Sequence, residues 1–132
     1  MKLEPINPES LGAPKGYSNG ILCPAGGRLL FVAGQIAWDQ QQKFVAATFG
    51  AQFRRALANV VAVVAEAGGQ ADQIASMRIY VTDKRLYLAE LKEVGAAYRE
   101  FMGKHFPAMA LVEVRGLLED QALVEIEATA VI

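Results

Sequence analysis

The sequence of 132 residues has one cysteine, one histidine and one tryptophan. A lone Cys23 excludes an internal disulfide, and with only His105 beside it the chain lacks the ligands for an ordinary Cys/His zinc site. We therefore expect neither a metal nor a cofactor. No activating base accompanies Cys23, so we expect it to be a small core residue, and its isolation favours a reducing cytosol.

The sequence also has no large excess of positive or negative charge and no long run of apolar residues. Thirteen Lys and Arg stand against fourteen Asp and Glu, for a net charge of −1, so no overall field attracts nucleic acid or anionic lipid. The longest apolar run, Val60–Ala65, is far shorter than a membrane span, and Met1–Pro5 lacks the apolar stretch of a leader. We expect a soluble cytoplasmic protein with no nucleic-acid or membrane partner.

Apolar material is abundant. Hydrophobic residues make up 53% of the chain and charged residues 20%, which excludes a disordered linker and supports a single domain over residues 1–132. The surplus is available for burial between subunits.

The first third of the chain predicts strands. The segment through Gly16 is polar, and we expect it to be an N-terminal arm that leads into the fold. The β-rich runs Gly20–Cys23 and Leu29–Ile36 are separated by Pro24–Arg28, whose two glycines permit the positive φ of a hairpin loop. We therefore predict a β-hairpin.

Two amphipathic helices follow. Apolar residues recur every three or four positions after Thr48, which is the expected N-cap, and Gly68–Gly69 supplies the stop. A second helix is expected from Asp83 to Gly103, with the apolar stripe Leu91, Val94, Tyr98 and Phe101.

Three further strands are expected at Ile74–Val81, Ala108–Arg115 and Leu123–Ile132, the last two joined by a short acidic turn at Glu119–Asp120. The order β-β-α-β-α-β-β predicts an α+β fold, with two helices on one face of a mixed sheet. Several strands carry apolar residues at both parities, so the other face requires partner subunits.

Six segments between Tyr17 and Ala130 resemble, in their order and spacing, the reactive-intermediate (imine/enamine) deaminase family RidA, also called YjgF-type. They are Tyr17-Ser18, Leu30–Ile36 ahead of Asp39, Gln52–Asn59 followed by Gly68, Tyr80–Asp83, Phe106–Ala108 and Val124–Ala128. The resemblance implies a chorismate-mutase-like fold and a homotrimer with three small-molecule clefts between subunits.

The resemblance also implies catalytic roles. In active family members the arginine of a Pro-Ala-Arg motif grips the substrate carboxylate, while a tyrosine, a glutamate and backbone groups handle the C=N carbon and its attacking water. Here the arginine position is Met109; Leu111 stands where cysteine is common, and Ala33 where serine is common. A thioether makes none of the charge-assisted hydrogen bonds of a guanidinium, so short 2-imino acids are unsuitable substrates.

Glu125 and Tyr17 take the catalytic positions implied by the resemblance, and the substrate-binding candidates are Ala33, Gly34, Met109, Leu111 and Arg115. Each has a structural alternative. Glu125 is either a proton carrier or a strand carboxylate paired with a cation, with Glu127 the weaker candidate, and Tyr17 is either a ligand contact or an interface plug. Gly34 is either a cleft wall or a β-bulge, and Met109 either packs on a flat ligand or belongs to the core.

Strand alternation places Arg115 on the face of Met109, so Arg115, or else Arg78, is a possible substitute anion contact. A solvated or subunit-bridging role is the alternative for both arginines. His105 has no partner for a triad or metal site and is expected to be a loop residue.

Two functions remain open. The first is hydrolysis of an imine- or enamine-type metabolite other than the usual 2-imino acids, and the second is a non-catalytic metabolite-binding trimer for sensing or scaffolding. Ribonuclease activity, attached to some relatives, gains little support from a near-neutral chain with one histidine.

Overall fold

The computed structural model describes residues 2–132. Its helices are α1 (Phe49–Glu66), α2 (Lys84–Ala89) and α3 (Leu91–Met102), with short 3-10 turns at Glu9–Leu11 and Ala71–Gln73. Its strands are β1 (Glu4–Ile6), β2 (Gly20–Leu22), β3 (Leu29–Gln35), β4 (Ile74–Val81), β5 (Ala108–Glu113) and β6 (Val124–Val131). The expected α+β class is confirmed.

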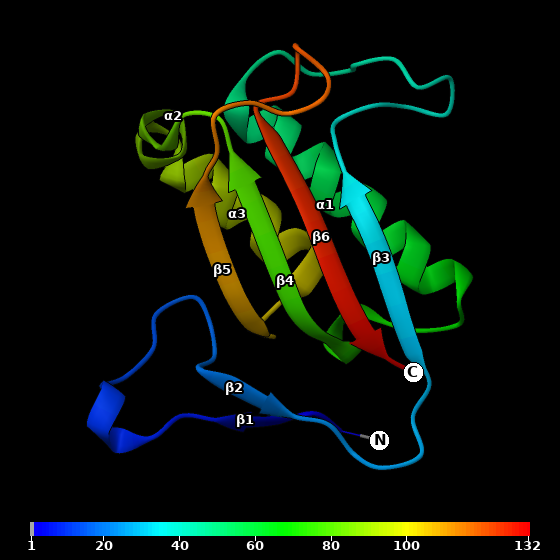
Figure 1. Ribbon diagram of the computed structural model, residues 1–132, viewed down its shortest axis with the longest axis vertical. Coiled ribbons are helices and arrows are strands. Elements are labelled where there is room, and N and C mark those ends of the chain that lie inside the picture. Colours follow the sequence, from blue (N-terminus) through cyan, green and yellow to red (C-terminus); the bar gives the residue numbers. More distant parts are fainter. Residues whose placement is uncertain (1) are drawn as a thin grey trace.

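A four-stranded mixed sheet carries the fold, in the order β3-β6-β4-β5 (Figure 1). β4 and β5 are parallel, as a helical crossover requires, while β6 lies between β3 and β4 and is antiparallel to both. The expected joining of β5 and β6 by a short acidic turn is therefore wrong. β5 ends at Glu113 rather than Arg115, and residues 114–123 form a long connection.

The predicted hairpin between Gly20–Cys23 and Leu29–Ile36 is also wrong. β2 pairs with β1 in a separate two-stranded sheet, and β3 pairs only with β6. The cause lies at Ser18, whose backbone N donates to Pro107 O at 3.0 Å and whose Oγ donates to Phe106 O at 2.5 Å. These bonds hold the arm at the β5 edge, so β2 crosses below the sheet before the chain turns up into β3 (Figure 1).

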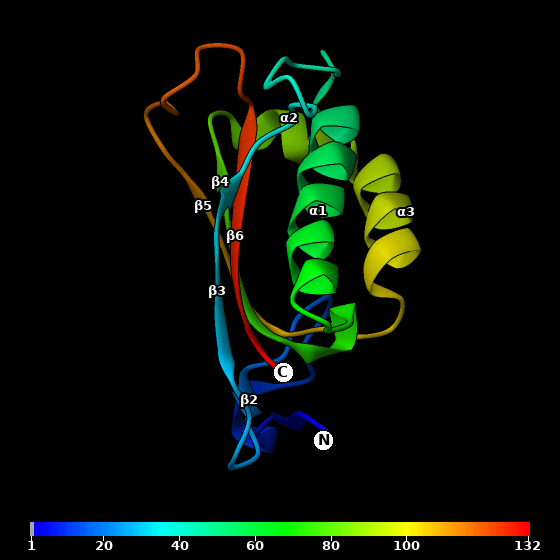
Figure 2. The same ribbon diagram turned by 90° about the vertical axis from the view of Figure 1, so that its right-hand side faces the viewer.

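All three helices lie on one face of the sheet (Figure 2). The expected caps are confirmed: Thr48 Oγ1 accepts from Ala51 N, and Gly68 takes a φ of 85° just after α1. The core lies between α1, α3 and the sheet, and its largest buried side chains include Phe49, Phe53 and Leu57.

The expected single helix from Asp83 to Gly103 is broken into α2 and α3. Glu90 leaves helical geometry, with φ −122° and ψ 32°, and its Oε1 accepts from Gly50 N at the start of α1, at 3.2 Å. A carboxylate is favourable at a helix N-terminus, where backbone N–H groups lack partners. Tertiary packing of α1 on this junction thus overrides the helical periodicity.

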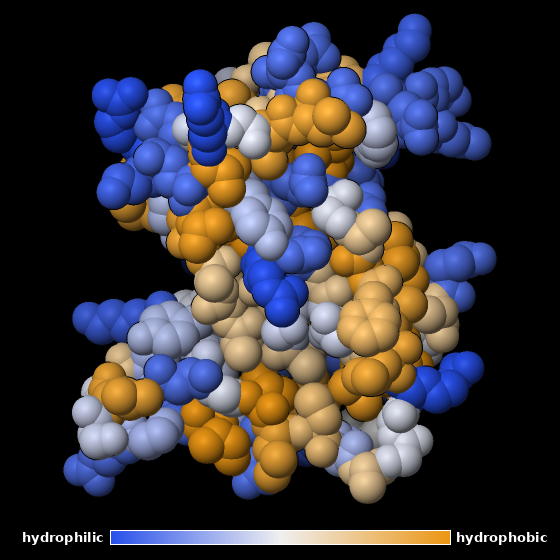
Figure 3. Space-filling view, viewed as in Figure 1, coloured by the Kyte–Doolittle hydropathy of each residue, from blue (hydrophilic) through white to orange (hydrophobic). Residues whose placement is uncertain are grey.

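The other face of the sheet is not covered by any described part of the chain. Leu29, Phe31 and Val112 are exposed there, Phe31 with 74% of its surface. Apolar residues gather along the β3 side of this face, and hydrophilic residues lie across its middle (Figure 3). The arm adds further exposed apolar side chains at Ile6, Leu11 and Leu22. No helix of the described chain is long and apolar enough to cross a membrane.

Candidate functional site

A cavity of about 330 Å³ opens between helices α2 and α3 and strands β4 and β5; we call it the α3–β5 cavity. Most of its lining is hydrocarbon or aromatic. The lining residues are Gly16, Phe53, Ile79, Tyr87, Leu91, Val94, Gly95, Tyr98, Arg99, Phe106, Met109 and Leu111. Its size and composition are typical of a small-molecule site.

One wall of the cavity is a stacked aromatic pair. The rings of Tyr98 and Phe106 lie 5.4 Å apart with an interplanar angle of 4°. The Tyr98 hydroxyl donates to His105 O at 2.6 Å, and burial raises the pKa of Tyr98 above its usual value. Tyr98 is therefore neutral at physiological pH and serves as a rigid wall.

Met109 and Leu111 belong to this cavity because of strand register. In the parallel pair, Met109 is opposite Met77 and Leu111 opposite Ile79, and cross-strand partners share a face. Met77 and Ile79 are buried against the helices, so Met109 and Leu111 lie on the helix side of β5, half-buried. Met109 thus lies on a cavity wall that is also packed against the core.

The arm brings Tyr17 close to the same cavity. Gly16 lines the cavity, Ser18 is fixed to the start of β5, and Tyr17 lies between them with 39% of its surface exposed. This neighbourhood could not be deduced from a hairpin, which places residues 20–23 beside β3 at the opposite edge of the sheet.

Glu125 and Gly34 form a second group of candidates on the uncovered face. β3 bulges between Val32 and Gln35, so Ala33 and Gly34 both oppose a single β6 residue. The Glu125 side chain fills the space above Gly34, where a Cβ would lie 2.1 Å from Oε2. The bulge interpretation of Gly34 is confirmed, and Ala33 and Gly34 form an exposed ledge beside the Glu125 carboxylate.

The two strand glutamates differ in their engagement. Glu127 accepts the Tyr80 hydroxyl proton in a short hydrogen bond and lies 3.6 Å from the Arg78 guanidinium. The hydrogen bond to Glu127 raises the pKa of Tyr80 above its usual value. Among residues 2–132, Glu125 makes no ion pair or side-chain hydrogen bond. Of the two glutamates, Glu125 is therefore the one whose carboxylate is free to bind a ligand or exchange a proton.

Glu125 and Met109 lie on opposite faces of one sheet. Glu125 is opposite Tyr80 in the β4–β6 pairing, on the uncovered face, whereas Met109 faces the helices. A single chain therefore cannot bring its own Glu125 to its own α3–β5 cavity. A site that uses both groups requires two chains.

The arginine candidates separate clearly. Arg115 lies beyond the end of β5 in the exposed connection, so strand alternation does not apply to it. Arg78 is on the uncovered face beside Glu127. Arg99 on α3, which the sequence did not single out, lines the α3–β5 cavity; its signal was its place directly after Tyr98, next to the apolar stripe of that helix.

His105 and Cys23 do not line the α3–β5 cavity. His105 lies in a loop, as expected, with Nε2 2.7 Å from Ile74 O. Cys23 is exposed just after β2, so its assignment to the core is wrong: the strand that was to bury it does not join the main sheet. Within residues 2–132, no group of three His, Cys, Asp or Glu side chains is arranged to hold a metal.

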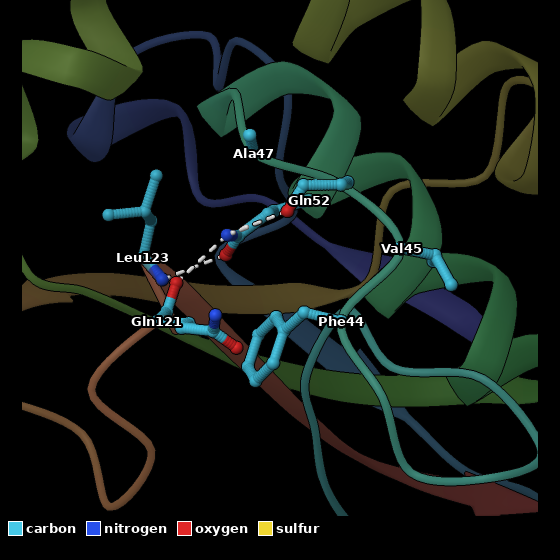
Figure 4. A pocket seen from close by; sticks show the side chains of 7 residues that line it. Phe44, Val45, Ala47, Gln52, Gln121 and Leu123 are labelled. Atoms are coloured by element: carbon cyan, nitrogen blue, oxygen red, sulfur yellow. Dashed lines mark hydrogen bonds between the residues drawn. The ribbon is translucent and has the colours of Figure 1, made fainter.

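A more open hollow of about 520 Å³ lies near the start of α1, lined by Phe44, Val45, Ala46, Ala47, Gln52, Gln121 and Leu123. Its floor is Gln52, which donates to Ala46 O and Gln121 O and accepts from Leu123 N at 2.8 Å (Figure 4). The buried amide is thereby engaged by the backbone of two loops. The hollow lies where loops 37–47 and 114–123 meet the start of α1, and Gln52 joins the three segments.

We predict that Gln52→Ala lowers the free energy of unfolding by about 2–4 kcal/mol, because it removes three hydrogen bonds to partly buried backbone groups and opens a void where the buried side chain lay. Urea denaturation at fixed protein concentration measures the loss. The exposed Gln41→Ala is the matched control, expected to change stability by less than about 0.5 kcal/mol. Equal stabilities of the two variants would contradict the structural role of Gln52.

Comparison with known proteins adds a consistent set of similarities. A sequence profile of the family described as Endoribonuclease L-PSP matches residues 8–132. The 2-iminobutanoate/2-iminopropanoate deaminase of Salmonella typhimurium is 37% identical over 108 residues, which cover 80% of each chain.

Two solved structures illustrate the structural similarity. The Rid-family protein YyfB from Yersinia pestis, described as of unknown function, has a TM-score of 0.88 and 32% identity, and the match covers 100% of both chains. E. coli TdcF, solved with bound serine, has a TM-score of 0.68 and 31% identity over 92% of this chain and 91% of its own.

Proposed function

Since this chain belongs to the RidA/YjgF family, we propose that it is a homotrimer whose clefts between subunits hydrolyse an imine- or enamine-type metabolite other than the short 2-imino acids. The observation that carries the proposal is the placement of Glu125 and the α3–β5 cavity on opposite faces of one sheet. Two such halves form one site only when chains associate.

Association is supported by what the single chain leaves exposed. The uncovered sheet face carries Leu29 and Phe31, exposed by 64% and 74%. Within residues 2–132, β3 pairs with β6 on one side, and its other edge has no strand partner. The β1–β2 ribbon has only three residues in each strand, and isolated two-stranded ribbons are marginally stable in water. Burial against neighbouring copies stabilises both features.

Glu125 is the proposed proton carrier. In the proposed reaction a water oxygen adds to the C=N carbon while the Glu125 carboxylate accepts the water proton. Glu125 returns this proton to the imine nitrogen, which gives a neutral carbinolamine. The carboxylate then carries the carbinolamine hydroxyl proton to the same nitrogen, and the C–N bond breaks to release ammonia and leave a carbonyl. Gly34 leaves the space that the carboxylate occupies, and Tyr17 supplies a ring and hydroxyl beside the cavity.

The substrate class follows from Met109. A guanidinium at this position forms two charge-assisted hydrogen bonds with a carboxylate, and losing about 3 kcal/mol of such binding in the transition state slows turnover by on the order of 100-fold. Met109, Leu111 and Ala33 all make the proposed cleft more apolar than the family pattern. The substrate is accordingly less dependent on a carboxylate at that point.

A non-catalytic metabolite-binding trimer is the second candidate. It is favoured by the scarcity of proton donors and acceptors in the cavity, where even the Tyr98 hydroxyl is engaged by His105 O. Ribonuclease activity is not favoured, since His105 is bonded to Ile74 O and the net charge is −1. We place the protein in the cytoplasm, where an exposed Cys23 thiol stays reduced.

We predict a particle of about three times the 14.2 kDa chain mass in light scattering. Phe31→Glu, which puts a charge on the uncovered face, should shift the mass toward that of one chain. Leu118→Glu alters a side chain that is 93% exposed in the long connection and should leave the mass unchanged. A wild-type mass equal to that of one chain would refute the proposed cleft between subunits.

We also predict that the wild-type protein accelerates the decay of short 2-imino acids negligibly, and that Met109→Arg raises this rate because a carboxylate clamp returns. Trapping of the remaining imine over time measures both. The gain should be partial, since Ala33 and Leu111 still lack the polar groups of the family pattern. Wild-type turnover of these substrates, unchanged by Met109→Arg, would show that Met109 does not set the specificity.

A further inference from the structure

We propose that Arg99 is the carboxylate-binding residue of the α3–β5 cavity, and that the cavity takes a carboxylic acid with an aryl or branched apolar body. The inference rests on the proposed function in one respect only, because it names the substrate class of that cleft. The evidence for Arg99 is the set of residues that line the cavity. Among the residues that line it, Arg99 is the only charged one.

Arg99 has no acidic partner within residues 2–132. Arg54, Arg78 and Arg85 pair with Glu100, Glu127 and Asp83. Arg28, Arg55 and Arg115 have no acidic partner among the described residues either, but none of these three lines the cavity. The side chain of Arg99 is exposed, so its guanidinium reaches both water and the cavity mouth. An arginine fork without a carboxylate partner is available for a bidentate bond to a ligand.

The guanidinium is directed along α3 toward the cavity. Its Nη1 lies 3.2 Å from the position that a Cβ on Gly95 would occupy, so the missing side chain at Gly95 leaves room for it. Gly95 itself lines the cavity. The guanidinium thus occupies cavity-side space that any larger residue at position 95 would take.

A purely structural role for Arg99 would be interaction with the helix dipole, since it lies in the last turn of α3. That role requires the charge near the C-terminal carbonyl groups. The guanidinium instead lies beside Gly95, one turn toward the N-terminus. This direction is usual for a helical side chain, and here it brings the guanidinium beside a residue that lines the cavity.

The cavity determines the rest of the ligand. Its volume of about 330 Å³ and its hydrocarbon walls suit a ring or branched chain, for which Met109, Leu111 and the stacked Tyr98–Phe106 pair provide contacts. With Met109 in the motif position, the positive charge moves from strand β5 to helix α3. An acid with only a two- or three-carbon body would leave most of this cavity unfilled.

Binding of phenylacetate and of its neutral analogue phenylacetamide, measured by titration calorimetry on the assembled protein, tests the proposal. We expect Arg99→Gln to weaken phenylacetate binding by about 10-fold or more and to leave phenylacetamide binding unchanged, since only the acid uses the charge. Arg99→Lys should retain part of the affinity. Arg85→Gln, an exposed arginine on α2 outside the cavity lining, is the matched control and should affect neither probe.

Equal phenylacetate affinity in wild type and Arg99→Gln would overturn the proposal, as would equal loss of both probes or the same loss in Arg85→Gln. Failure to bind phenylacetate at all would overturn it too. The outcome is separable from the fate of the proposed function. If phenylacetate binding depends on the Arg99 charge but no imine tested is hydrolysed, the role of Arg99 is supported and the proposed hydrolase activity is refuted. If an imine is hydrolysed at a rate that Arg99→Gln does not change, the role of Arg99 is refuted and the hydrolase activity is supported.

Discussion

The uncovered face of the four-stranded sheet is the constraint on which the rest of the structure depends. Three helices cover one face and bury its apolar residues, while Leu29, Phe31 and Val112 stay exposed on the other. Exposed apolar strands next to an unpaired edge favour association. The same arrangement separates Glu125 from Met109 by the thickness of the sheet, so that the proposed assembly and the proposed chemistry depend on one surface.

The proposed cleft combines an element layout shared with structural relatives and an apolar lining. Glu125 rests over Gly34 without a cation, while the neighbouring Glu127 is occupied by Tyr80 and Arg78. The cavity across the sheet is almost entirely apolar and carries one charge, on α3. The site we propose therefore selects a substrate by the shape of its apolar body more than by a carboxylate held on β5.

Local patterns in the sequence predicted the elements well and their long-range partners less well. Thr48, Gly68 and Asp83 mark helix ends as expected, because caps depend on residues within one turn. The hairpin failed because Ser18 binds the start of β5, a contact 88 residues away along the chain. Similarly, Glu90 breaks the second helix by accepting a hydrogen bond from Gly50 N in α1. The place of Arg99 in the cavity lining could not be predicted either, because it depends on how α3 packs against β5.

The central claim is that Glu125 of one chain meets the Met109 wall of another. Cross-linking tests it most directly, with Met109→Cys and Glu125→Cys chains co-expressed in a Cys23→Ser background and treated with a short bismaleimide. The account predicts covalent dimers from the mixture but not from either variant alone. No dimer from the mixture, or dimers equally abundant in each variant alone, would contradict it.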